Sequence, residues 1–134
     1  MKEEKIKELI EYWLATAEHD RDVMEYLYAG GKYSNSLFFG HIILEKILKA
    51  LVVLKTKTEA PYTHDLLKLL QMTQLTLLEE ERRLLAVVND FNIRARYADY
   101  KLEFYKKATK SYTESHLSQI KALYTKLWQI MKQK

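Results

Sequence analysis

The sequence predicts an all-α protein, an up-and-down antiparallel bundle of four long helices plus a short one. Apolar residues recur at intervals of three and four along most of the chain, which is the helical period. Only three Gly and one Pro occur in 134 residues, so we expect few turns and short connections. No segment alternates between apolar and polar residues as a half-buried strand does. The length suits a single domain, residues 1–134.

The first helix is predicted from Glu3 to Ala29, because Gly30 and Gly31 are a strong signal for a helix end. Asp20 falls within its apolar seam, where another apolar residue is expected. We expect this carboxylate to be partly buried and paired with a base or hydroxyl on a neighbouring helix. A functional carboxylate is the alternative interpretation. The seam consists of Ile6, Ile10, Trp13, Ala17, Met24 and Leu27.

The second helix, from about Ser34 to Thr56, is apolar nearly all round. Such a helix must be covered on most sides, by its own domain or by a second chain. Its apolar surface is more than one small bundle can easily cover, and this predicts a homodimer. His41, Glu45 and Lys49 recur every four residues and therefore lie on one face. We interpret them, with Asp20, as a buried polar network that fixes the packing of the helix. A functional site is the alternative.

Capping signals define the later helices. Thr63 or Asp65 caps a short third helix, His64 to about Met72, and Thr76 with Glu79 reads as a capping box for a fourth that ends near Phe91. Its predicted inward residues are Leu77, Leu78, Leu84, Leu85 and Val88. Residues 92–100 have no clear period, one or two helical turns are expected within 101–108, and the last helix is expected over residues 114–131.

The charge is unevenly distributed. The net charge is +4, but residues 1–26 hold eight acidic and four basic residues. Residues 94–110 hold six basic and two acidic residues. Such a segment can bind phosphates or an acidic partner, although a solvated lysine-rich surface is the more ordinary interpretation.

Several classes of protein are excluded. Without cysteine there is no thiolate catalysis, disulfide or Cys-based zinc site. Gly-rich phosphate loops, nucleophile elbows and paired-histidine metal motifs are also missing, so we predict no metal and no cofactor. The longest apolar run is interrupted by Glu45, Lys46 and Lys49, which argues against a membrane span. With no apolar signal segment after Met1, we expect a cytoplasmic location.

Four segments of the chain carry a family resemblance when they are taken in order: Trp13–Asp20, Gly31–Ser34 with Phe39–Ala50, Thr63–Leu66, and Asn92–Tyr100. Together they resemble the HEPN-domain family of small helical bundles, which commonly form dimers, although Ala98 replaces the usual proline of the last segment. Ribonucleases of this family carry Arg followed by His after four to six residues. No Arg of this chain is followed by His at that separation. The resemblance therefore implies the non-nuclease subgroup, often encoded beside a minimal nucleotidyltransferase.

The favoured hypothesis is that the protein is a homodimeric binding domain that belongs to a toxin–antitoxin-like or defence-related system. It binds the phosphate of a nucleotide or RNA, or a partner nucleotidyltransferase. Arg94, Arg96 and Lys101 are the expected phosphate ligands, because the planar guanidinium of arginine grips phosphate in a bidentate way. Tyr97 and Tyr100 are expected to stack on a base.

Two alternatives remain at the level of the sequence. Arg96 can be structural and neutralise Asp20 or Glu45 inside the bundle. Alternatively, the protein is an RNase toxin or nucleotide-processing enzyme with a non-standard site. Its weak catalytic candidates are His41, Glu45 and His116.

Overall fold

The computed structural model describes residues 1–133, and within that range the chain forms six helices and no strand. This confirms the predicted all-α fold class. The helices are α1 (Glu3–Ala29), α2 (Tyr33–Thr56), α3 (Leu66–Thr73), α4 (Glu79–Arg96), α5 (Ala98–Lys107) and α6 (Lys110–Gln133).

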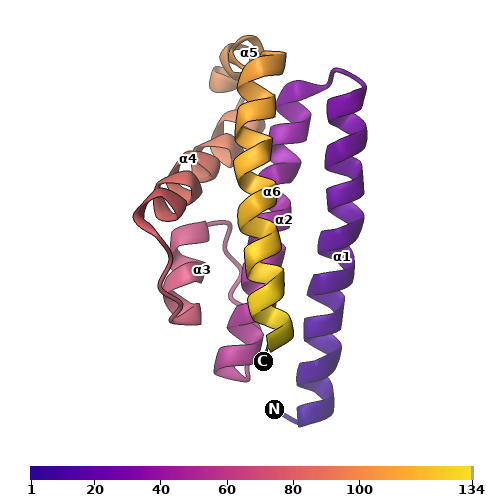
Figure 1. Cartoon of the computed structure of the whole chain (residues 1–134), viewed down its shortest axis with the longest axis vertical. Coiled ribbons are helices and arrows are strands. Elements are labelled where there is room, and N and C mark those ends of the chain that lie inside the picture. Colours follow the sequence, from indigo (N-terminus) through magenta and orange to yellow (C-terminus); the bar gives the residue numbers. More distant parts are fainter. Residues whose placement is uncertain (134) are drawn as a thin grey trace.

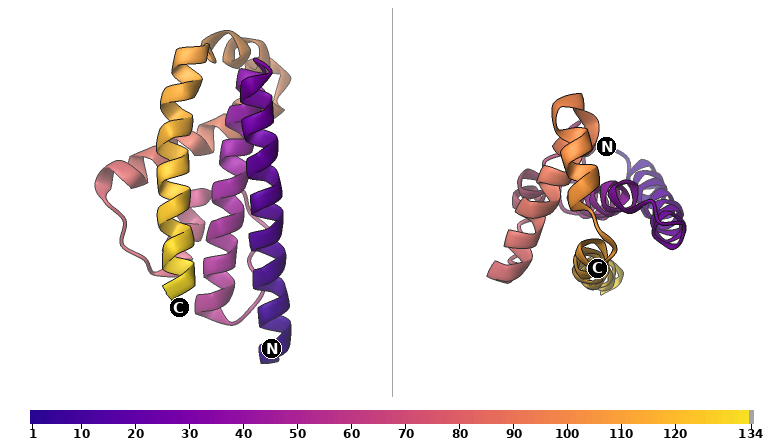
Figure 2. Two further views of the ribbon diagram at one scale, coloured as in Figure 1. Left: turned by 45° about the vertical axis from the view of Figure 1, so that its right-hand side comes forward. Right: turned by 90° about the horizontal axis from the view of Figure 1, so that it is seen from above.

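Helix α2 lies at the centre of the bundle (Figure 1). Helix α1 runs antiparallel to it on one side, α6 runs alongside it, and α3 and α4 cover the side opposite α1. Helix α4 is inclined to the other long helices, and α5 lies across the end of the bundle where α1 turns into α2 (Figure 2). The long helices therefore alternate in direction, as an up-and-down bundle requires.

The chain itself buries most of α2. Fourteen of its 24 residues are buried, including every residue from Ile47 to Val53. A second chain is therefore not needed to cover this helix, and the packing argument for a homodimer is wrong. The neighbouring helices of the same chain supply the cover, and homodimerisation stays a prediction that rests on the family resemblance.

Most of the helix ends follow the sequence signals. Helix α1 ends at Gly30 and Gly31, where Gly31 adopts a φ of 76° and the amide of Lys32 donates to the carbonyl of Leu27. The Asp65 carboxylate caps α3 by accepting the amides of Leu67 and Lys68, which confirms Asp65 and not Thr63 as the cap; the helix begins at Leu66, two residues later than the predicted His64.

The capping box predicted from Thr76 and Glu79 is wrong. Helix α4 begins at Glu79, and its cap pair is Leu78 with Glu81, whose carboxylate accepts the Leu78 amide at 2.8 Å. Lys126 of α6 also binds the Glu81 carboxylate, and this contact favours a helix that begins at Glu79. Leu78 is accordingly 56% exposed and not an inward residue.

Residues 92–110 are more helical than the sequence indicated. Helix α4 continues to Arg96, α5 spans ten residues, and α6 begins at Lys110. The helical period was hidden because α4 buries a polar residue, Asn92, and α5 buries only Phe104. No helix within residues 1–133 is both long enough and apolar enough to cross a membrane.

Gly40 marks a close approach of α2 and α6. A Cβ added at this position would lie 2.8 Å from Cδ1 of the fully buried Ile120. We expect Gly40→Ala to lower the free energy of unfolding by about 1 kcal/mol, because overpacking outweighs the gain in helix propensity. In an Ile120→Val background, which removes Cδ1, the same substitution should become neutral or stabilising. Urea denaturation of the double-mutant cycle measures this coupling, and additive effects would contradict the close packing.

Candidate functional site

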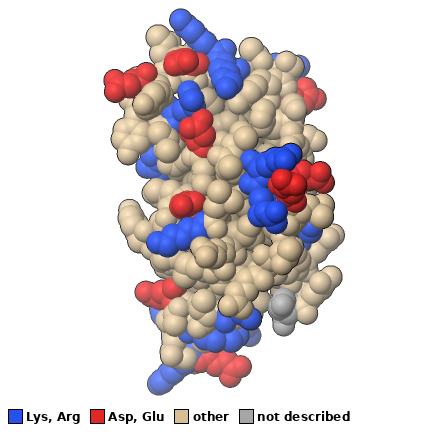
Figure 3. Space-filling view, turned by 90° about the vertical axis from the view of Figure 1, so that its left-hand side faces the viewer, with Lys and Arg blue, Asp and Glu red and all other residues tan. Residues whose placement is uncertain are grey.

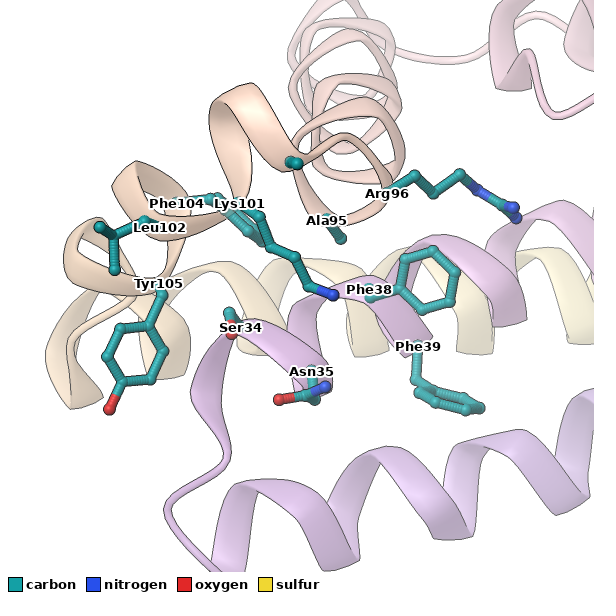
Figure 4. Close-up of a pocket in the computed structure, with 11 residues that line it drawn as sticks. Ser34, Asn35, Phe38, Phe39, Ala95, Arg96, Lys101, Leu102, Phe104 and Tyr105 are labelled. Atoms are coloured by element: carbon teal, nitrogen blue, oxygen red, sulfur yellow. The ribbon is translucent and has the colours of Figure 1, made fainter.

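A pocket of about 680 Å³ opens between the first turns of α2, the end of α4 and helix α5 (Figure 4). Side chains from three helices meet here because α5 lies across the end of the bundle. The lining residues are Ser34, Asn35, Phe38, Phe39, Ala95, Arg96, Ala98, Lys101, Leu102, Phe104 and Tyr105.

Arg96 and Lys101 are the two basic residues of the pocket lining. The Nε–H of Arg96 donates to Asn92 Oδ1 at 2.8 Å, and its guanidinium lies 5.3 Å from the centre of the Phe38 ring. None of the ion pairs between residues 1–133 involves Arg96 or Lys101. The pocket lining therefore carries two positive charges and no carboxylate.

Aromatic rings and a helix start complete the pocket. The Phe38 and Phe39 rings contact each other edge to face, with 5.9 Å between their centres. Tyr105 extends from α5 at the mouth and is 68% exposed. Ser34 and Asn35 belong to the first turn of α2, whose N-cap residue makes no side-chain capping bond. The first amides of a helix have no intrahelical acceptor and favour anions.

The other predicted phosphate and stacking residues lie outside the pocket lining. Arg94 pairs with Asp90 on its own helix, and that hydrogen bond and charge raise the pKa of Arg94. Its guanidinium also lies 5.9 Å from the centre of the Tyr100 ring. Tyr97 and Tyr100 are 59% and 47% exposed. On the side of the molecule shown in Figure 3, basic and acidic side chains are interspersed and do not form one basic surface.

A buried polar network lies next to the pocket and centres on Glu45, which is 6% exposed. Its carboxylate accepts one hydrogen bond from Lys49 Nζ at 3.0 Å and another from His64 Nδ1 at 2.9 Å. The Lys49 ammonium also lies 5.1 Å from the centre of the Trp13 ring. The Glu45 carboxylate thus joins α2 to the segment before α3, and Lys49 extends the network to Trp13 on α1.

Asp20 belongs to a separate ion pair, 2.6 Å from Lys46 Nζ. The carboxylates of Asp20 and Glu45 therefore have lysine partners on α2. The alternative in which Arg96 neutralises either of them is wrong, because Arg96 instead binds the neutral amide of Asn92.

His41 is fully buried and connects the network to the pocket. Its Nε2 lies 2.8 Å from the carbonyl oxygen of His64, which can only accept, so this nitrogen carries the proton. Its Nδ1 then accepts from Asn92 Nδ2 at 3.3 Å. Burial, which outweighs the nearby Glu45 carboxylate, lowers the pKa of His41. The imidazole is therefore neutral near pH 7.

With this geometry established, comparison with known proteins assigns the family. A model of the HEPN domain matches residues 10–130. The chain belongs to the HEPN domain family. The HEPN domain also resembles the crystal structure of TT1696 from Thermus thermophilus, with a TM-score of 0.74 and 19% identity over 90% of this chain and 96% of that one. This likeness shows the fold alone. No curated protein sequence matches.

The catalytic candidates of this HEPN domain do not gather in one open site. His41 and Glu45 are buried in the network. His116 lies between α4 and α6, where its Nδ1 lies 2.8 Å from the Tyr112 carbonyl and its ring contacts Tyr112 and Phe91. No group of three His, Asp or Glu residues within the described chain could hold a metal ion.

Sequence reasoning missed Phe38, Tyr105 and Asn92. Phe38 was included in the apolar second helix, and Tyr105 lies within residues 101–108, where only one or two helical turns were expected. Asn92 precedes Arg96 by one helical turn, and this spacing is a usable signal for a polar pair.

Proposed function

We propose that this HEPN domain binds a nucleotide unit, free or within RNA, with its phosphate on Arg96 and Lys101. The observation that carries the proposal is the hydrogen bonding of the Arg96 guanidinium. Its Nε is held by Asn92, while its two terminal nitrogens have no carboxylate partner among the described residues and remain available for a bidentate phosphate contact. In Figure 4 the Lys101 side chain extends toward Phe38, the ring over which Arg96 lies.

The remainder of the pocket suits the apolar face of a base. Phe38, Phe39 and Tyr105 offer aromatic surface, on which bases stack without strong sequence preference. The volume of about 680 Å³ falls within the range of small-molecule sites. A minimal nucleotidyltransferase partner and a role in a toxin–antitoxin module stay predictions from the family resemblance.

Titration with adenosine monophosphate, followed by calorimetry, tests the proposal. Arg96→Ala should weaken binding about 10- to 100-fold, because a charge-assisted phosphate contact contributes about 1.5–3 kcal/mol. Lys101→Ala should weaken it less, since its flexible ammonium lacks the bidentate geometry. Separate titrations with adenosine and with inorganic phosphate show how much of the affinity comes from the nucleoside and how much from the phosphate.

Arg94→Ala is the matched control. It removes the same charge from the same helix two residues away, but Arg94 does not line the pocket. The proposal fails if both arginine variants lose affinity equally, or if the wild type binds neither the nucleotide nor a short single-stranded RNA. Cleavage of that RNA, if lost in Arg96→Ala, would instead support the enzyme hypothesis.

A further inference from the structure

Asn92 is a buried polar residue, 5% exposed, and both the oxygen and the nitrogen of its side-chain amide are hydrogen-bonded. Its oxygen accepts from Arg96 Nε at 2.8 Å, and its nitrogen donates to His41 Nδ1 at 3.3 Å. The amide thus bridges the pocket arginine to the central helix.

The direction of these bonds depends on His41. Because His41 Nε2 donates to the His64 carbonyl, His41 Nδ1 is a lone-pair acceptor. Only the NH₂ end of an amide can donate to this acceptor, so the oxygen of Asn92 must face the other way, toward Arg96. If His41 carried a proton on Nδ1, that nitrogen could no longer accept from the Asn92 amide and would instead face the Glu45 carboxylate, whose Oε1 lies 3.7 Å away.

We propose that His41 and Asn92 are positioning residues for Arg96: neutral His41 orients the Asn92 amide, and Asn92 holds Arg96 Nε, which leaves both terminal nitrogens free to bind the ligand. Neither residue lines the pocket. The proposal rests on the proposed function for the identity of the ligand, but the hydrogen-bond relay is present without one.

The relay gives the polar face of α2 a role beyond packing. An exposed arginine loses side-chain entropy when it grips a phosphate. In this HEPN domain, the Asn92 hydrogen bond and the Phe38 ring restrict the side chain before a ligand arrives. The gain should appear as higher phosphate affinity, since less ordering remains to be done on binding.

Two NMR measurements test the relay in the wild type without any ligand. The imidazole nitrogens of His41 should show a protonated Nε2 and an unprotonated Nδ1 at pH 7. The Nε–H of Arg96 should exchange with solvent slowly, and about tenfold or more faster in Asn92→Leu, which keeps the approximate shape but removes the acceptor. A proton on His41 Nδ1, or unchanged exchange in Asn92→Leu, would overturn the proposal.

Binding of adenosine monophosphate then separates positioning from packing. Asn92→Leu and His41→Leu should each weaken binding about tenfold, the effect of one lost hydrogen bond. His41→Gln offers one donor and one acceptor, as neutral histidine does, and should restore most of the affinity. If His41→Leu fails to fold, comparison of the wild type, Asn92→Leu and His41→Gln still decides the question.

The outcomes distinguish this proposal from the proposed function. If Arg96→Ala loses affinity but Asn92→Leu binds as the wild type does, the pocket is the site and the positioning role is wrong. If the wild type binds no nucleotide, the proposed function fails, and the histidine tautomer and Arg96 exchange still support or refute the relay.

Discussion

Replacing Glu45 by alanine should lower the free energy of unfolding by about 2–4 kcal/mol, measured by urea denaturation. The Glu45 carboxylate binds both Lys49 and His64, and Lys49 is only 5% exposed. Without Glu45 this charge would stay buried beside the Trp13 ring with no anionic partner. Breaking a buried pair by removing one partner is costly for this reason.

Glu79→Ala is the matched control. Glu79 also pairs with a base four residues later, Arg83, but both side chains are mostly exposed. Its loss should change stability by less than about 0.5 kcal/mol. Replacing both charges of the buried pair, as in Glu45→Leu with Lys49→Met, should recover much of the loss, because no unpaired charge remains. Equal effects of Glu45→Ala and Glu79→Ala would contradict this account of the network.

Local spacing in the sequence was enough to group part of the network. His41, Glu45 and Lys49 share one face because the helical period requires it. Their remaining partners could not be predicted in this way. His64 lies 19 residues after Glu45, and Asn92 lies 51 residues after His41. These contacts depend on how α3 and α4 pack against α2, which a single sequence does not specify.

The candidate site shows the opposite error, because adjacency in sequence was taken for adjacency in space. Arg94 and Arg96 were grouped as one phosphate site, yet two residues in a helix point about 200° apart around its axis. Arg94 accordingly turns to Asp90, whereas Arg96 turns to Asn92 and lines the pocket. Recognising that α4 continues to Arg96 would have separated the two residues. The polar residue Asn92 on its inner face concealed that continuation.

Replacing Phe104 by alanine should lower the free energy of unfolding by about 3 kcal/mol and release α5 from the bundle. Phe104 is the one residue between Ala98 and Lys107 that is buried, and its ring centre lies 5.4 Å from that of Phe91 on α4. Truncating a buried phenylalanine leaves a cavity and typically costs about 3–5 kcal/mol. The lower end applies here because α5 can detach locally before the bundle unfolds.

Amide hydrogen exchange locates the effect. Protection should fall in residues 98–107 of Phe104→Ala, while α1 and α2 keep theirs. Leu102→Ala, on the same helix but 63% exposed, should leave stability within about 0.5 kcal/mol of the wild type.

Affinity for adenosine monophosphate should fall together with the protection of α5, since Lys101 and Tyr105 reach the pocket only while this helix is docked. Arg96 lies on α4 and would remain in place, so the residual affinity of Phe104→Ala measures the contribution of α4 and α2 alone. If Phe104→Ala releases α5 but binds the nucleotide as tightly as the wild type, α5 is not part of the site. Arg96 would then be the one basic residue of the pocket that takes part in binding.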